Sequence, residues 1–237
     1  MAEKTKSLAA VVSQEKIATD IYSLILATPA AQKAVAGQFV SVYCKDRTKL
    51  LPRPISICEI NREAETLRLV YRVTGKGTGT EEFSRLKAGD QVEILGPLGN
   101  GFPLTGKKPL VIGGGIGVPP MLELAQALSR VLLVEEVKAG RADGSGDSRQ
   151  EGRDVRVTAV LGYRDSQLFL KEEFEPWAKV YVSTDDGSAG TKGTVIDAVR
   201  ENGVEADVIF ACGPKPMLRA VKAYAAEKGI PCYVSLE

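Results

Sequence analysis

The sequence contains no histidine and only four cysteines among its 237 residues. Without histidine, a Ser-His-Asp triad, a histidine-ligated zinc site and histidine-based general acid catalysis are all excluded. The cysteines, Cys44, Cys58, Cys212 and Cys232, are widely spaced and form no Cys-x-x-Cys pair. Their spacing supports neither a zinc site nor an iron–sulfur cluster within these residues, so we predict no metal ligands and four reduced thiols.

Long apolar runs and a strong net charge are also missing. No apolar run reaches the length of a membrane span, and residues 1–10 lack the apolar segment of a signal peptide. Lys and Arg number 31 and Asp and Glu 30, with no basic stripe, which argues against a nucleic acid partner. The sequence therefore predicts a cytoplasmic protein that neither enters a membrane nor binds nucleic acid.

The first hundred residues contain short, partly alternating segments rich in β-branched and aromatic residues, separated by turn residues. We expect strands at 8–12, 21–27, 38–44, 55–60, 66–73 and 91–95, and a short helix at 80–86. Six short strands at this spacing predict a small antiparallel Greek-key β-barrel.

After residue 106, strand-like and helical segments alternate, which predicts a parallel sheet covered on both faces. The expected strands are 109–112, 155–161, 180–183 and 208–211, and the expected helices 119–134, 167–174, 195–202 and 216–228. We therefore predict a barrel domain at 1–104, an α/β nucleotide-binding domain at 105–230 and the start of a further segment at 231–237. The polar stretch 138–154 is expected to be a flexible surface insertion, with a charged docking loop as the alternative.

Arg53-Pro54-Ile55-Ser56 lies at a turn entering a strand. A planar, permanently charged Arg suits a pyrophosphate, Pro fixes the backbone, and the Ser hydroxyl could hydrogen-bond a flavin ring nitrogen. For this tetrapeptide alone, a β-turn with a surface Arg is the simpler interpretation.

Gly77-Thr78-Gly79-Thr80 leads into a helix start, with Thr80 as the expected N-cap. Glycines and free N–H groups at a helix start suit a phosphate. On the strand before it, Val70-Tyr71-Arg72 could place a Tyr face and an Arg beside a flavin, although Arg72 could equally be solvated.

Two further motifs lie in the α/β half. Gly113-Gly114-Gly115-Ile116-Gly117 follows a strand and opens a helix, the layout of a dinucleotide loop, but it departs from G-x-G-x-x-G because Val118-Pro119-Pro120 replaces the last part. Cys212-Gly213-Pro214 ends the last expected strand, where the thiol could lie against a nicotinamide; a buried structural Cys is the alternative.

Asp185 follows another strand at the same edge, where its carboxylate could bind a ribose hydroxyl and repel a 2′-phosphate. Arg164, at the end of the strand that holds Gly162 and Tyr163, favours NADP instead. On balance the sequence favours NAD over NADP.

Taken in this order, the motifs resemble those of the electron-transfer subunits of NAD-linked heterotetrameric dihydroorotate dehydrogenases, in the ferredoxin-reductase-like superfamily. The resemblance covers nearly all of residues 8–237 and is most specific at 53–57, 71–78 and 96–102. It implies a flavin-binding barrel followed by an NAD-binding domain. The FAD residues it implies are Arg53, Pro54, Ile55, Ser56, Val70, Tyr71, Arg72, Gly77 and Thr78. The residues it implies around the nicotinamide are Gly113, Gly114, Gly115, Gly117, Cys212, Gly213 and Pro214.

The resemblance also implies a [2Fe–2S] cluster, because family members carry a cysteine-rich segment after a stretch similar to residues 230–237. The cluster ligands are not among the residues of this sequence. Three explanations stay open: the segment was removed, it was left out of the sequence, or this relative does without it.

The resemblance implies hydride transfer between NAD and FAD, with electrons exchanged with a separate FMN-containing catalytic subunit in an assembly of two plus two chains. That subunit would oxidise dihydroorotate to orotate in pyrimidine synthesis. Two alternatives remain: the reductase subunit of an NAD(P)H:ferredoxin or sulfide oxidoreductase, and a non-catalytic structural or regulatory subunit. The presence of Arg53, Ser56 and Thr78 argues against the second alternative.

Overall fold

The structure is a computed structural model that describes residues 5–138 and 156–236. The chain forms two compact units, which divide between Gly101 and Phe102. Apart from Lys138, the predicted insertion at 138–154 lies outside the described residues.

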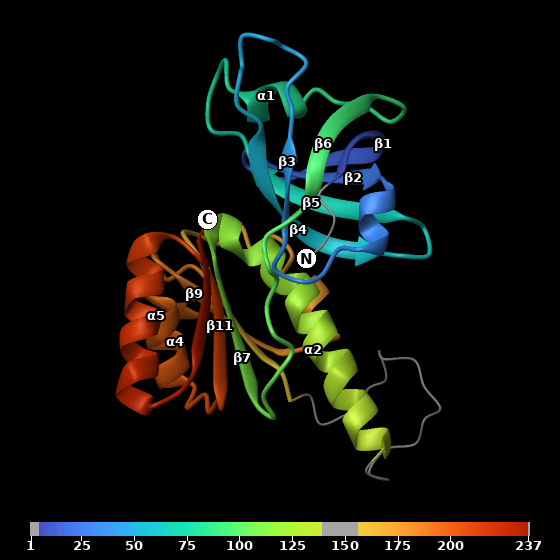
Figure 1. Cartoon of the computed structure of the whole chain (residues 1–237). Helices are drawn as coiled ribbons and strands as arrows, with labels where there is room; N and C mark the ends of the chain where they lie inside the picture. Colours follow the sequence, from blue (N-terminus) through green and yellow to red (C-terminus); the bar gives the residue numbers. More distant parts are fainter. Residues whose placement is uncertain (1–4, 139–155, 237) are drawn as a thin grey trace. The chain divides into compact units, whose positions relative to one another are not determined.

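The first unit is a closed six-stranded antiparallel barrel with the strand order β1-β2-β5-β4-β3-β6 (Figure 1). Its strands are β1 (Thr5–Ala18), β2 (Ile21–Ala27), β3 (Phe39–Val42), β4 (Arg53–Asn61), β5 (Thr66–Arg72) and β6 (Gln91–Leu98). Two short helices join them, the 3₁₀ helix η1 (Pro29–Gln32) and α1 (Gly79–Phe83).

Side-chain alternation along the strands builds the core of the barrel. Ile55 and Ile57 of β4, and Leu67, Leu69 and Tyr71 of β5, all point inward and are buried in one cluster. Because successive side chains of a strand point to opposite faces, the residues between them point away from this core. The alternation therefore separates residues that stabilise the barrel from residues that can bind a ligand.

The predicted elements of this unit differ in their limits, most clearly the first strand and the helix. The polar run from Ser13 to Lys16 was expected to lie outside the first strand, but it pairs with β2, so β1 extends to Ala18. Helix α1 is shorter than expected, and its N-cap is Thr78 rather than Thr80, because the Thr78 hydroxyl accepts the Glu81 amide.

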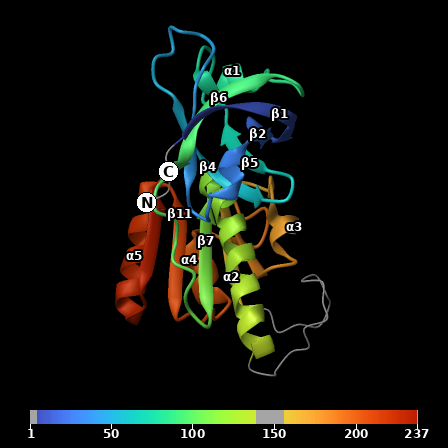
Figure 2. The same ribbon diagram turned by 45° about the vertical axis from the view of Figure 1, so that its right-hand side comes forward.

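The second unit is a six-stranded sheet with the order β10-β9-β8-β7-β11-β12, and every pair in it is parallel. The strands are β7 (Pro109–Gly114), β8 (Thr158–Tyr163), β9 (Lys179–Thr184), β10 (Thr191–Lys192), β11 (Val208–Gly213) and β12 (Cys232–Leu236). The helices are η2 (Gly115–Gly117), α2 (Val118–Lys138), α3 (Lys171–Phe174), α4 (Val195–Glu201) and α5 (Lys215–Lys228). Figure 2 shows α2 and α5 on opposite faces of the sheet.

Three elements of this sheet domain differ most from the prediction. Helix α3 has four residues instead of the expected 167–174, because residues 166–170 form tight turns that end at Leu170 with a left-handed backbone. Strand β10 was not predicted, because its two residues are too few to show an alternation of apolar and polar side chains. Residues 232–236 were expected to begin a further segment, but they form β12 and pair with β11.

The order of the strands fixes where this sheet can bind a ligand. From β7 the chain proceeds through β8 and β9 to β10 on one side, and then returns to place β11 on the other side of β7. The point where the direction reverses lies between β7 and β11, and open parallel sheets bind ligands at the carboxyl end of this point. The predicted architecture, an antiparallel barrel followed by a parallel α/β sheet, is confirmed.

No helix within the described ranges is long and apolar enough to span a membrane.

Candidate functional site

The outward-facing side of β4 and β5 carries four of the residues predicted to bind flavin. Pro54 and Ser56 alternate with the core residues of β4, and Val70 and Arg72 alternate with those of β5. The two strands are neighbours, with Ile57 opposite Leu69. Beyond this pair, residues 53–56 of β4 pair with β3, and residues 70–72 of β5 pair with β2. The four residues therefore lie on the outward face of two adjacent strands.

Ile55 and Tyr71 lie on the opposite face of the same strands, in the barrel core. Tyr71 is 3% exposed, its ring stacks on Tyr22, and its hydroxyl donates to Gln14 Oε1 at 2.8 Å. Burial raises the pKa of this hydroxyl. The sequence interpretation placed the Tyr71 ring beside a flavin, whereas strand alternation turns the ring inward and leaves only its main chain toward the binding face.

Arg53 begins β4 and packs against the start of α1. A Cβ atom built on Gly79 would lie 2.8 Å from Arg53 Nε and 2.7 Å from Cys44 Sγ, so any side chain at position 79 would displace the guanidinium. Arg53 Nη1 also donates to the Leu51 carbonyl. The glycine thus lets a permanent cation lie beside the first amides of a helix, which is the donor chemistry that a pyrophosphate requires.

The loop before α1 is already ordered by its own hydrogen bonds. Thr78 Oγ1 donates to the Gly75 carbonyl at 2.7 Å, and the Gly77 amide donates to Glu81 Oε2 at 2.5 Å. The hydrogen bond from the Gly77 amide is the main reason why the pKa of Glu81 is lowered. A phosphate that used the Gly77 amide would have to replace the Glu81 carboxylate there, and Arg85, 2.8 Å from Glu81, already pairs with that carboxylate.

In the second unit, the glycine loop and the Cys-Gly-Pro motif meet at the switch point of the sheet. Gly113 of β7 is the register partner of Cys212 of β11. A Cβ atom on Gly117 would lie 2.4 Å from the Cys212 carbonyl oxygen and 2.6 Å from Gly213 Cα. Because these contacts are to backbone, no larger residue fits at position 117 without moving a strand.

Gly114 and Gly213 complete this junction. A Cβ atom on Gly114 would lie 2.3 Å from Met217 Sδ, and one on Gly213 would lie 3.1 Å from the Gly114 carbonyl oxygen. Gly213 also has a φ of +154°, which side chains rarely allow. The edge of the sheet before η2 and α2 therefore has no side chains at these positions. A ligand can approach the backbone closely there.

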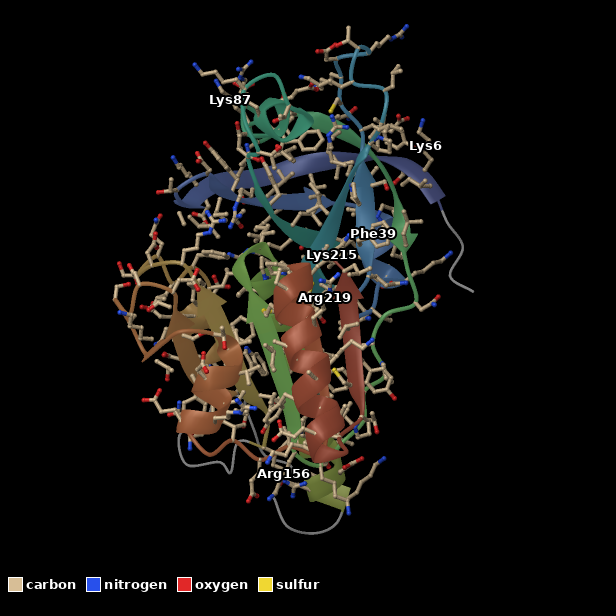
Figure 3. The ribbon with its side chains drawn as sticks, turned by 90° about the vertical axis from the view of Figure 1, so that its left-hand side faces the viewer. Lys6, Phe39, Lys87, Arg156, Lys215 and Arg219 are labelled. Atoms are coloured by element: carbon tan, nitrogen blue, oxygen red, sulfur yellow. The ribbon has the colours of Figure 1, made fainter. Side chains whose placement is uncertain are left out.

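Cys212 is only 1% exposed, so its thiol is buried. Pro214, in contrast, is exposed and is the N-cap of α5. Figure 3 shows Lys215 and Arg219 on the first turns of α5, at the opposite end of this unit from Arg156. The two cations therefore lie at the carboxyl edge of the sheet, beside the glycine junction.

Asp185 is exposed directly after β9, and its amide donates to the Tyr163 carbonyl of the neighbouring β8. The next carboxylate, Asp186, is held by Ser188, whose amide and hydroxyl donate to Oδ1 at 2.9 and 2.6 Å. These bonds lower the pKa of Asp186. Three strand spacings, about 14 Å, separate β9 from β11. Asp185 and the glycine junction therefore lie at separate points along the same carboxyl edge of the sheet.

Four residues shape these sites in ways that the sequence interpretation did not specify. Gly79 was part of the predicted glycine loop, but its contact with Arg53 was not foreseen, and Glu82, Gly162 and Met217 were given no binding role. Gly162 is the register partner of Gly114, and Glu82 fastens the loop between β3 and β4. For the glycines, their position at strand ends and helix starts was a usable signal, whereas nothing in the sequence indicated the partners of Glu82 and Met217.

No group of three His, Cys, Asp or Glu side chains gathers as metal ligands in residues 5–138 and 156–236. All four cysteines lie within these ranges, and no disulfide joins them.

Comparison with known proteins divides the chain in the same two halves. The family described as "Oxidoreductase FAD-binding domain" matches residues 8–102, and "Oxidoreductase NAD-binding domain" matches residues 111–223.

Among the curated relatives that match almost the whole chain are two named "Dihydroorotate dehydrogenase B (NAD(+)), electron transfer subunit". The one from Geobacillus sp. (strain WCH70) is 41% identical over 234 residues, covering 96% of this chain and 81% of the relative. The one from Streptococcus mutans serotype c is 41% identical over 232 residues, covering 96% and 80%.

Among solved structures, the NADH-dependent reduced ferredoxin-NADP oxidoreductase matches with a TM-score of 0.77 and 30% identity, covering 98% of this chain and 76% of that one. The ferredoxin reductase of carbazole 1,9a-dioxygenase, at 22% identity and a TM-score of 0.77, covers 98% and 69% and shares the fold.

Proposed function

Because the chain belongs to the family of dihydroorotate dehydrogenase B (NAD(+)) electron transfer subunits, we propose that it carries electrons between NAD and a catalytic partner subunit through bound FAD. The observation that carries the proposal is the pair of glycine-shaped junctions. One lies beside Arg53 and the other lies at the switch point of the sheet.

The barrel unit is proposed to hold FAD. Arg53 and the first amides of α1 would bind the pyrophosphate, with Thr78 keeping the helix start in place. Ser56 and the outward face of β4 and β5 would lie along the flavin, with Pro54, Val70 and Arg72 beside it. FAD supplies the step from two-electron to one-electron chemistry, and the protein provides binding and orientation.

The sheet unit is proposed to bind NAD along its carboxyl edge. The loop of Gly113, Gly114, Gly115 and Gly117, together with Gly213 and Pro214, would take the nicotinamide end. Asp185 would accept a hydrogen bond from the adenosine ribose and disfavour a 2′-phosphate. Since the Cys212 thiol is buried, its contribution would be to pack the glycine junction rather than to react.

The partner would be an FMN-containing catalytic subunit that oxidises dihydroorotate, in a complex of two plus two chains in the cytoplasm. The overall reaction balances as dihydroorotate plus NAD⁺ giving orotate, NADH and a proton. A [2Fe–2S] cluster would connect the two flavins, with ligands that are not among residues 1–237.

A second candidate is favoured by one finding, the 30% identity to an NADH-dependent reduced ferredoxin-NADP oxidoreductase. In that case the same two sites would exchange electrons with a ferredoxin or sulfide-linked partner instead. The chemistry within this chain would be the same, and only the partner would differ.

The test begins with the purified chain under anaerobic conditions, supplied with FAD and titrated separately with NADH and NADPH. We expect a flavin spectrum that NADH bleaches at a lower concentration than NADPH. A protein that takes up no FAD would overturn the proposal. With a protein that also carries the cluster ligands, adding the catalytic subunit and dihydroorotate should yield NADH from NAD⁺, whereas ferredoxin reduction without that activity would favour the second candidate.

A further inference from the structure

The loop between β3 and β4, residues 43–52, has both of its ends near Arg53, the arginine of the proposed pyrophosphate site. Near its start, Cys44 Sγ lies 2.7 Å from the point where a Gly79 Cβ would be, and Arg53 Nε, at the start of β4, lies 2.8 Å from the same point. Figure 1 shows this loop beside α1. The loop is therefore closed over one small region of the barrel unit.

A set of hydrogen bonds fastens this loop to α1. Glu82 Oε1 accepts the Lys45 amide at 2.5 Å, and Glu82 Oε2 lies 3.1 Å from Lys49 Nζ. Lys49 also reaches Asp46 at 3.5 Å, and Asp46 accepts the Thr48 amide at 2.9 Å. Lys49 and Glu82 are only 18% and 22% exposed. The loop is thus a built structure and not a loose connection.

The fastened loop nevertheless presents two adjacent leucines to solvent. Leu50 is 85% exposed and Leu51 is 75% exposed, more than any other large apolar side chain of the described residues. Exposing such side chains is unfavourable, so a loop that is ordered and yet holds both of them outward is arranged for an apolar partner.

The order of residues along the chain indicates what that partner is. Ser56 lies on the proposed flavin face, and Arg53 lies three residues before it at the proposed pyrophosphate. Leu51 and Leu50 come two and three residues before Arg53, and the Leu51 carbonyl accepts a hydrogen bond from Arg53 Nη1, so this part of the loop lies beside the guanidinium. In FAD the adenosine lies beyond the pyrophosphate from the flavin, so the sequence of residues follows the sequence of groups in the cofactor.

We propose that Leu50 and Leu51 cover the adenosine half of FAD, and that the loop fastened by Glu82 thereby selects FAD over FMN. This inference rests on the proposed function, since it extends the same FAD site. FMN shares the flavin and one phosphate with FAD but has no adenosine for the leucines to cover. A docked protein is a poorer occupant, because a stable interface needs about 800 Å² from each partner and two side chains supply a small part of that.

The test compares the affinities of FAD and FMN for the apoprotein by quenching of flavin fluorescence. In a double variant, Leu50→Ser with Leu51→Ser, we expect FAD to bind about tenfold more weakly and FMN to bind as in the parent protein. Leu8→Ser is the matched control, because Leu8 is 64% exposed on β1 and far along the chain from Arg53. It should change neither affinity.

Glu82→Gln provides a second, independent variant that leaves both leucines in place. Releasing the loop should weaken FAD by a smaller factor and again leave FMN unchanged. Unchanged FAD affinity in both variants, or an equal loss of FAD and FMN, would overturn the inference, as would loss of catalytic-subunit binding with FAD affinity intact. If the parent protein binds neither flavin, the proposed function fails, and this inference fails with it.

Discussion

The two candidate sites depend on different kinds of residue. The site in the barrel unit has one glycine, Gly79, but depends chiefly on side chains, namely the guanidinium of Arg53 and the carboxylate of Glu82. The site in the sheet unit depends on side chains that are missing, because Gly114, Gly117 and Gly213 let two strand ends and a helix start come together. The first site should therefore fail when a group is removed, and the second when a single methyl is added.

The largest expected effect comes from adding that methyl at Gly117. Gly117→Ala would place a Cβ 2.4 Å from the Cys212 carbonyl oxygen and 2.5 Å from its carbonyl carbon. Since backbone has to move, we expect the sheet unit to lose about 3 kcal/mol of stability and the protein to lose NADH-dependent bleaching. FAD uptake by the barrel unit should persist. Thermal unfolding and NADH titration of the FAD-loaded protein check both effects.

Gly203→Ala is the control for this change. Gly203 has a φ of +56°, and a Cβ there would meet nothing within 4 Å. The substitution should cost only the backbone strain, about 1 kcal/mol, and leave NADH titration unchanged. If the two variants lost stability and the response to NADH equally, crowding at the junction would not explain why position 117 needs glycine.

The next effect in size comes from removing a group in the barrel unit. Arg53→Ala should weaken FAD about 30-fold, roughly 2 kcal/mol, because a charge-assisted contact to the pyrophosphate is lost. The barrel should stay folded, since Arg53 lies at the end of a strand and outside the core cluster. Flavin content after gel filtration and the dissociation constant of FAD measure the loss.

Arg85→Ala removes the same charge nearby and serves as its control. The Arg85 side chain is 73% exposed and pairs with Glu81 on the surface of α1. Exposed pairs contribute little, so FAD affinity should hardly change. If Arg85→Ala weakened FAD as much as Arg53→Ala, general charge rather than the contact at Gly79 would explain the result.

The same difference between side chains and glycines explains what the sequence could predict. The glycine motifs were identified because close approach of backbone demands one residue type, and strand ends of a parallel sheet meet at a known edge. Both motifs, Gly113–Gly117 and Cys212-Gly213-Pro214, do meet there. The architecture was predictable for a similar reason, since alternation and helical period are local.

The side chains of the barrel site were harder to predict. The direction of each residue of β4 and β5 depends on which face the barrel closes over, and this put the Tyr71 ring in the core. The pairing of Glu82 with residues 45 and 46 joins positions 36 or more apart, which no local pattern reveals. The burial of the Cys212 thiol likewise depends on packing across the sheet, not on its own neighbours in the sequence.

Two adjacent carboxylates allow a smaller test, on the choice of coenzyme. Asp185→Asn should reduce the preference for NADH over NADPH about tenfold, because a charge that disfavours a 2′-phosphate is removed. Asp186→Asn removes the same charge one residue later, but the Asp186 carboxylate is engaged by Ser188. It should leave the preference near that of the parent protein. Equal shifts would mean that the net charge of the loop, and not the carboxylate of Asp185, sets the preference.

The smallest expected effect concerns the half-buried thiol of Cys44, beside Arg53 and Gly79. Burial, with a further contribution from Glu82, raises the pKa of this thiol, so alkylation should be slow at neutral pH and faster as the pH rises. Bound FAD should slow it further, about threefold, by covering the loop and the arginine beside it. Cys232 is also half-buried, with a pKa raised by burial, but it lies on β12 of the other unit. Its alkylation rate, followed by mass spectrometry in the same sample, should not respond to FAD, and a rate at Cys44 equally indifferent to FAD would place the cofactor away from the loop.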